Sequence, residues 1–71
     1  MGDSEKPLVD GESLKARRKR IRMSVQELSL ETGLSASVIR ELEKGGAVEA
    51  DTLSRLASAL RVKPEELMVE E

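Results

Sequence analysis

Six of the eight residues at positions 15–22 are basic, and together they could neutralise a row of phosphates. They are Lys15, Arg17, Arg18, Lys19, Arg20 and Arg22. Residues 13–44 hold eight basic and four acidic side chains, a formal charge of +4, whereas residues 1–12 and 45–71 each carry −3. This segregation of charge is what a nucleic-acid surface requires, although a solvated basic helix would have the same composition.

The chain lacks the residue types that most often serve in catalysis and metal binding. There is no Cys and no His, so disulfides, thiolate and imidazole metal ligands and the commonest general base are all absent. A serine nucleophile would have no His partner, and no loop has the carboxylate spacing of a calcium site. We therefore expect no enzymatic activity, no metal, no cofactor and no small-molecule substrate.

The length of 71 residues allows one small domain. Residues 1–10 lack periodicity and contain Pro7, so we expect a flexible acidic N-terminal arm followed by a domain at 11–71. No apolar run approaches the ~20 residues that span a bilayer, and the polar N-terminus is unlike a signal peptide. The sequence thus predicts a soluble, cytoplasmic protein without a membrane partner.

A first helix is predicted to begin between Asp10 and Ser13, where several residues suit an N-cap, and to run to about Arg22. Leu14 and Ile21 lie seven residues apart, so we expect them to share its buried face. The basic residues cover the remaining surface of this helix.

Two further helices are predicted on either side of a tight turn. Ser24 is the expected N-cap of the second helix, with Glu27 completing a capping box. Gly33 ends this helix, and Ser35 then caps a third helix that should run to about Lys44.

The rest of the chain predicts two more helices. The fourth opens at Glu49 or Asp51 and carries apolar residues at spacings of three and four, and Pro64 suits the first position of a short fifth helix. No period-two alternation extends over a useful length, so no strand is expected. The predicted fold class is all-α, a compact five-helix domain.

Residues 24–45 match a supersecondary pattern in which two helices are joined by a short turn around a Gly. Gly33 suits the turn because a left-handed backbone costs a residue with a Cβ roughly 1 kcal/mol or more. Ser29 is small at the point where the third helix should pass closest to the second. This pattern is the helix-turn-helix.

The stretch from Leu14 to Leu67 resembles the lambda-repressor-like family, also known as the Cro, phage-repressor or XRE type. The matching segments follow in the family's order: Leu14–Arg18, Ser24–Thr32, Gly33–Ser35, Glu43–Gly45 and Thr52–Leu60. The resemblance implies a transcriptional regulator, repressor-like and associated with the nucleoid. It would bind double-stranded DNA as a homodimer, with its third helix in the major groove.

The resemblance also implies which residues would meet DNA. Ala36, Ser37, Arg40 and Glu41 would read the bases: Arg40 has the fork that suits guanine, Glu41 can accept from cytosine, and Ala36 can touch a thymine methyl. The residues expected to position the phosphate backbone are Arg18, Arg22, Ser24 and Lys44. Arg18 is further expected to form an ion pair with Glu43.

Several departures from the family pattern favour an alternative function. Val25 stands where the family commonly has Gln, Arg22 where it has Gly, and Lys44 where it has Asn, while the loop at 46–48 is uncharged. Val25, the uncharged loop, the acidic overall charge and the small number of base-reading side chains favour a helix-turn-helix fold repurposed as a protein–protein interaction module. The apolar segment at 67–69 exceeds what one short helix buries, so we expect it to contribute to a dimer contact.

Overall fold

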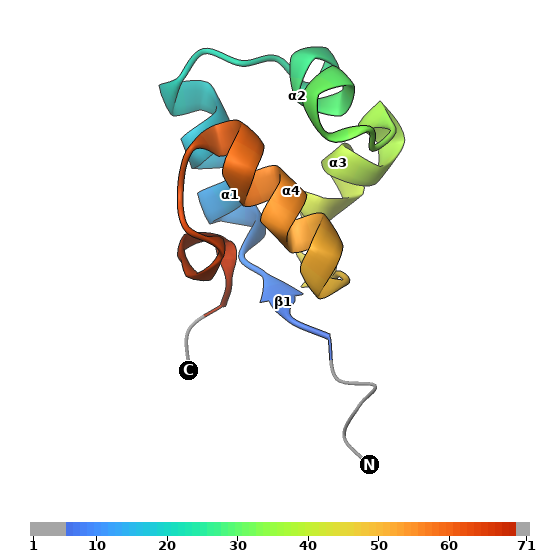
Figure 1. Ribbon diagram of the computed structural model, residues 1–71, viewed down its shortest axis with the longest axis vertical. Coiled ribbons are helices and arrows are strands. Elements are labelled where there is room, and N and C mark those ends of the chain that lie inside the picture. The colour runs from blue at the N-terminus through green and yellow to red at the C-terminus, as the bar shows by residue number, and fades with distance from the viewer. Residues whose placement is uncertain (1–5, 70–71) are drawn as a thin grey trace.

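Four short helices pack around a leucine-rich centre, and a pair of two-residue strands closes one end of the molecule (Figure 1). The computed structural model describes residues 6–69. In chain order the elements are β1 (Leu8–Val9), α1 (Gly11–Arg20), α2 (Val25–Thr32), α3 (Ala36–Leu42), β2 (Gly46–Ala47), α4 (Ala50–Leu60) and the 3₁₀ turn η1 (Pro64–Leu67). Within this described part, no helix is long and apolar enough to cross a membrane.

Side-chain caps set the starts of the first three helices where the sequence predicts them. Asp10 accepts from the backbone N–H of Ser13 at 3.2 Å. Ser24 and Glu27 form both halves of a capping box, and Ser35 caps α3. The ends are less well predicted, because α1 stops at Arg20 and α3 at Leu42, each two residues early.

The predicted fifth helix is a single 3₁₀ turn rather than an α-helix. Pro64 occupies its first position, as expected. The turn ends after four residues because Met68 adopts an extended backbone, with φ −102° and ψ 151°. The predicted count of five helices is therefore not confirmed, and the described residues form four α-helices and this 3₁₀ turn.

The segment just before α1 forms a strand, contrary to the expectation of a flexible arm and no strands. Leu8 and Val9 pair antiparallel with β2, and Val9 also bridges to Met68 on its other side. Val9 is 1% exposed, and the N–H of Asp10 donates to the Leu67 carbonyl at 2.8 Å. The domain thus begins before residue 11, while residues 1–5 of the predicted arm lie outside the described part. A two-residue strand is too short to show alternation in a sequence.

The core consists of aliphatic side chains from every helix, from β1 and η1, and from the segment that follows β2. The buried hydrophobic residues are Val9, Leu14, Leu28, Ile39, Leu42, Val48, Leu53, Leu56, Ala57, Leu60 and Leu67. Ile21 is not among them: it follows α1 as its C-cap and is 41% exposed, so the prediction that it shares a buried face with Leu14 is wrong.

The apolar segment at 67–69 also packs largely against the core of its own chain. Leu67 is fully buried, Met68 packs against the core, and the N–H of Val69 donates to the carbonyl of Leu8 at 2.9 Å. Only Val69 of this segment is substantially exposed. The segment is thus mostly buried against the rest of its own chain rather than by one short helix, and its apolar surface does not require a dimer contact.

Candidate nucleic-acid interface

The turn between α2 and α3 is fixed by local hydrogen bonds. Gly33 has φ 80°, in the left-handed region that the sequence predicts, and its N–H donates to the carbonyl of Ser29 at 2.8 Å. The Ser29 hydroxyl donates to the carbonyl of Leu34, and the Leu34 N–H donates to the Thr32 hydroxyl at 3.2 Å. These bonds hold α3 in one orientation against α2, so Ser29 acts through its hydroxyl as well as through its small size.

The outward face of α3 is mostly polar, with Val38 as its one large apolar side chain, 43% exposed. Ile39 and Leu42 anchor the helix to the core, and each residue is turned about 100° from the next. The predicted base-reading residues Ser37, Arg40 and Glu41 are consequently exposed, whereas Ala36 is half-buried at the edge of the same face. The fold thus brings together on one helix the side chains that the sequence singles out.

The four predicted phosphate-positioning residues lie in different surroundings. Ser24 is exposed at the start of α2, and Lys44 is exposed just after α3, with its Nζ 3.9 Å from a carboxylate oxygen of Glu41. Both partners of that contact are about three-quarters exposed, so it is too weak to hold Lys44 in place. Arg22 lies apart from α3, in the turn between α1 and α2, where Glu27, Leu30 and other residues share its hollow.

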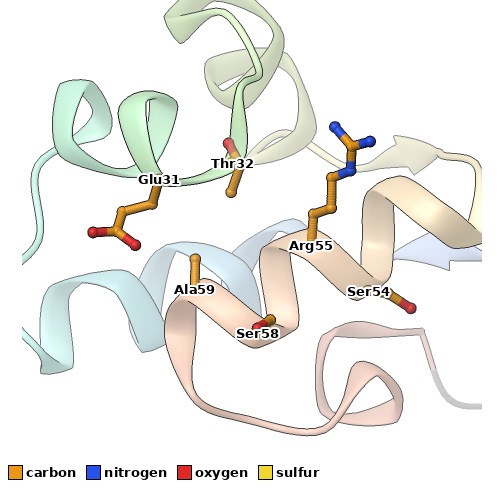
Figure 2. Close-up of a pocket in the computed structure, with 6 residues that line it drawn as sticks. All are labelled: Glu31, Thr32, Ser54, Arg55, Ser58 and Ala59. Atoms are coloured by element: carbon orange, nitrogen blue, oxygen red, sulfur yellow. The ribbon is translucent and has the colours of Figure 1, made fainter.

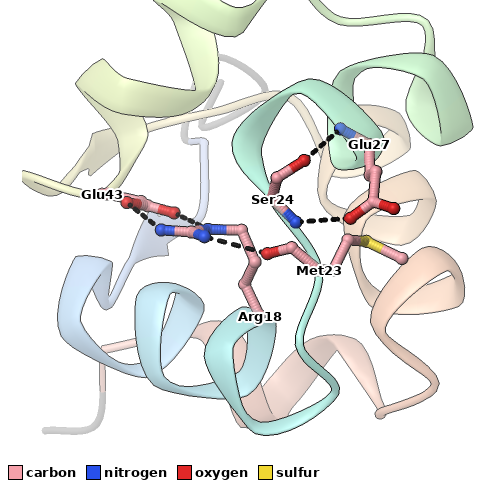
Figure 3. A network of polar contacts seen from close by, with 5 residues as sticks. All are labelled: Arg18, Met23, Ser24, Glu27 and Glu43. Carbon is pink, nitrogen blue, oxygen red and sulfur yellow. Dashed lines mark hydrogen bonds and ion pairs between the residues drawn. The ribbon is translucent and has the colours of Figure 1, made fainter.

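The guanidinium of Arg18 binds groups within the protein (Figure 3). Its Nε donates to Glu43 Oε2 at 2.6 Å, its Nη2 to Glu43 Oε1 at 3.2 Å, and its Nη1 to the Met23 carbonyl at 2.9 Å. Only 10% of either charged side chain is exposed. The expected ion pair is confirmed, but this geometry does not support Arg18 as a phosphate contact, because its guanidinium already binds both carboxylate oxygens and a carbonyl.

Gly11 is a site residue that the sequence analysis missed. A Cβ built at this position would overlap the backbone carbonyl of Glu43 and would lie 2.6 Å from the N of Gly45. The first turn of α1 therefore rests directly on the backbone at the end of α3. The only signal in the sequence is a Gly inside a helix start, which by itself suggests nothing about a contact 32 positions further along the chain.

An open hollow of about 520 Å³ lies between α2 and α4 (Figure 2). The Thr32 hydroxyl on its wall donates to the carbonyl of Leu28 at 2.8 Å, and the Nε of Arg55 lies 3.4 Å from Asp51. Both groups are engaged within the chain, so no ligand chemistry is assigned to this hollow. Among residues 6–69 there is also no group of three or more acidic side chains arranged to hold a metal ion.

Two helices fixed at a glycine turn, the second with a mostly polar outer face, are the pattern of a helix-turn-helix DNA-binding domain of the kind found in transcriptional regulators. Comparison with known proteins leads to the same class. The model of a helix-turn-helix family matches residues 14–67. The chain belongs to this family, of the lambda-repressor-like or XRE type.

One solved structure extends the comparison. The restriction-modification controller protein C.AhdI from Aeromonas hydrophila is 30% identical in sequence, with a TM-score of 0.74. The similarity covers 79% of this chain and 86% of that protein. A search of curated proteins found no match.

Proposed function

We propose that the protein binds double-stranded DNA with a sequence preference and regulates transcription, with α3 lying in the major groove. The observation that carries this proposal is the exposed, mostly polar face of α3, fixed in position by the turn at Gly33. A major groove about 12 Å wide admits one helix and presents hydrogen-bonding groups on every base pair. Ser37, Arg40 and Glu41 are the side chains on α3 with the matching chemistry.

Base reading and backbone positioning are divided between different residues. Arg40 is exposed and forms no ion pair within residues 6–69, so its fork is free for guanine O6 and N7. Glu41 accepts from cytosine, and Ala36 and Ser37 are short side chains that approach base edges closely. Lys44 and Ser24, at the end of α3 and the start of α2, contact phosphates, which sets the register without selecting sequence.

Arg22 is proposed as a further phosphate contact on account of its backbone. Its φ is 58°, in the left-handed region where the family pattern has Gly. A side chain there costs about 1–2 kcal/mol, and strain of this kind is concentrated at functional sites. A strained and exposed Arg in the turn before α2 is consistent with a role that Gly could not supply.

We further propose that the protein acts as a homodimer and as a repressor. The helix α3 has only seven residues, so one module makes few base contacts, and a second copy on a half-site about 34 Å away would double them. The similarity to a restriction-modification controller protein supports a regulatory role. A dimer bound across a promoter would block access to it.

A salt titration tests the proposal. With around four to six phosphate contacts, the slope of log K against log salt should be near −4 to −5 on duplex DNA. Sedimentation on a palindrome of about 20 base pairs should give two chains per duplex. No binding at low salt would refute the DNA function, whereas one chain per duplex at saturation would refute only the dimer.

One observation favours the alternative, in which the fold binds a protein instead. Leu30 on α2 is 85% exposed, and Ile21 and Met23 line the same hollow. Exposed apolar side chains that gather in this way are typical of protein contacts. Leu30→Ser should leave DNA binding unchanged if the proposed function is correct, and should abolish partner binding if the alternative is correct.

A further inference from the structure

The basic residues of α1 are divided between two flanks of the helix. Leu14 and Arg18 point inward, and the 100° rotation per residue then places Lys15 and Lys19 on one side and Arg17 and Arg20 on the other. The hollows of the surface follow this division. One hollow of about 360 Å³ is lined by Lys15 and Lys19, together with Glu12, Ala16 and Glu43. A second hollow is lined by Arg17 and Arg20, beside Leu60 and Arg61.

The lysine flank adjoins the end of α3. Glu43, the C-cap of α3, lines the same hollow as Lys15 and Lys19, and Lys44 is the next residue along the chain. The contact between Gly11 and the backbone of Glu43 and Gly45 fixes this juxtaposition. In contrast, Arg17 faces η1, where its Nη2 lies 3.0 Å from Glu66.

The two lysines are exposed and form no ion pair within the part of the chain that the structure describes. Glu43 does not neutralise them, because both of its carboxylate oxygens are bound by Arg18. Glu12 lies in the hollow but is not within ion-pair distance of either lysine. Like charges four residues apart on a helix repel, so among the described residues this flank is a positive site whose lysines pair with no carboxylate.

We infer that Lys15 and Lys19 form a phosphate-binding flank that grips one DNA strand beside the end of α3. This inference rests on the proposed function. When α3 lies in a major groove, the sugar–phosphate backbones pass along both sides of the groove. The element that adjoins the end of α3 then meets one of them, and Lys side chains are long enough to reach it. Lys15, Lys19 and Lys44 together supply the positive charge at this end of the interface.

The test compares two double variants that remove the same charge. Lys15→Ala/Lys19→Ala removes the proposed flank, and Arg20→Ala/Arg61→Ala removes two exposed cations around the other hollow. Binding to a labelled random duplex of about 20 base pairs is followed by fluorescence anisotropy over a range of salt. The lysine variant should lower the steepness of the salt slope by about 1.8, and its affinity at about 0.1 M salt by one to two orders of magnitude. The arginine variant should change the slope by less than about half of that amount.

Two further measurements make the outcome decisive. Lys15→Arg/Lys19→Arg should retain the wild-type slope, and circular dichroism melting should show all variants folded. Equal slopes for the lysine and arginine double alanine variants, with wild-type binding intact, would overturn this inference alone. No binding by the wild type would overturn the proposed function and this inference together.

Discussion

Two arginines hold nearly the same strained backbone, and the difference between them gives the sharpest prediction. Arg22 has φ 58° and Arg61 has φ 62°, and both are exposed. Arg22 follows α1 in the turn before α2, whereas Arg61 is the C-cap of α4. The substitutions Arg22→Gly and Arg61→Gly relieve the same strain in two turns that lie close to each other, since Ile21 and Arg61 line the same hollows.

The expected gain in stability follows from the backbone alone. A left-handed residue with a Cβ costs about 1–2 kcal/mol, and Gly gives back about 0.4–1 kcal/mol of this through the greater freedom of the unfolded chain. Each substitution should therefore stabilise the fold by about 0.5–1 kcal/mol, which raises the melting midpoint by about 2–8 °C in a domain of this size. Since the chain has no Trp or Tyr, circular dichroism is the suitable probe.

The two variants should differ on DNA. Arg22→Gly removes a proposed phosphate contact, so its salt slope on a random duplex should fall in steepness by about 0.9 relative to wild type. Arg61→Gly should bind as the wild type does. Equal salt slopes for the two variants would show that Arg22 does not contact the DNA backbone. Unchanged melting midpoints in both would show that the left-handed arginines are not strained, and the argument from strain to function would fail with them.

The remaining predictions concern the junction of α1 with α3, the turn and the reading helix. Arg18→Ala should destabilise the protein by about 3 kcal/mol, measured by urea unfolding, because it leaves the Glu43 carboxylate buried without a partner; a loss below about 1 kcal/mol would mean that water replaces the guanidinium. Gly11→Ala should cost about 1–3 kcal/mol through overpacking against the end of α3, and an unchanged urea midpoint would contradict the close approach. Gly33→Val should lower the melting midpoint by at least the equivalent of about 1 kcal/mol through its φ of 80°, since only Arg55 comes near its side-chain position. Arg40→Ala should cost about 1–3 kcal/mol on a selected site and much less on random DNA, and equal losses on both duplexes would make Arg40 a backbone contact.

The sequence predicts those parts of the fold that depend on local chemistry. Ser24, Ser35 and Gly33 act within four residues of their own position, and caps and left-handed turns are decided by such short-range bonds. The buried faces of α3 and α4 also follow from periodicity, because their Leu and Ile residues recur at helical spacing.

The features that the sequence could not predict depend on contacts between distant segments. β1 forms because Leu8 and Val9 find partners at residues 46–47 and 68, and a two-residue strand has no pattern of its own. The seven-residue spacing from Leu14 predicts that Ile21 is buried on the same helix face. The helix ends before Ile21, however, and the turn that follows leaves this side chain exposed. The role of Gly11 is decided by the backbone of Glu43, which no local rule connects to it.

The basic residues of α1 also show that a sequence pattern does not determine contacts between distant segments. A run of six basic residues indicates positive charge, but the inward direction of Leu14 and Arg18 decides which of them share a flank. Arg18 belongs to the ion pair with Glu43, Arg17 pairs with Glu66, and Lys15 and Lys19 are left beside the end of α3. The composition of residues 15–22 does not show which of these cations pair within the protein and which remain exposed.

The junction between α1 and α3 connects the two halves of the proposed interface. Arg18 binds the Glu43 side chain while Gly11 contacts the Glu43 backbone, so the last turn of α3 is attached to α1 at two points about two helical turns apart. A rigid attachment of this kind keeps α3 from rotating relative to α1. The phosphate contacts proposed for α1 would then fix not only affinity but also the angle at which Arg40 approaches a base pair. An overall charge of −2 is compatible with DNA binding on this account, because the local geometry of a few cations, rather than their total, determines where the backbone is held.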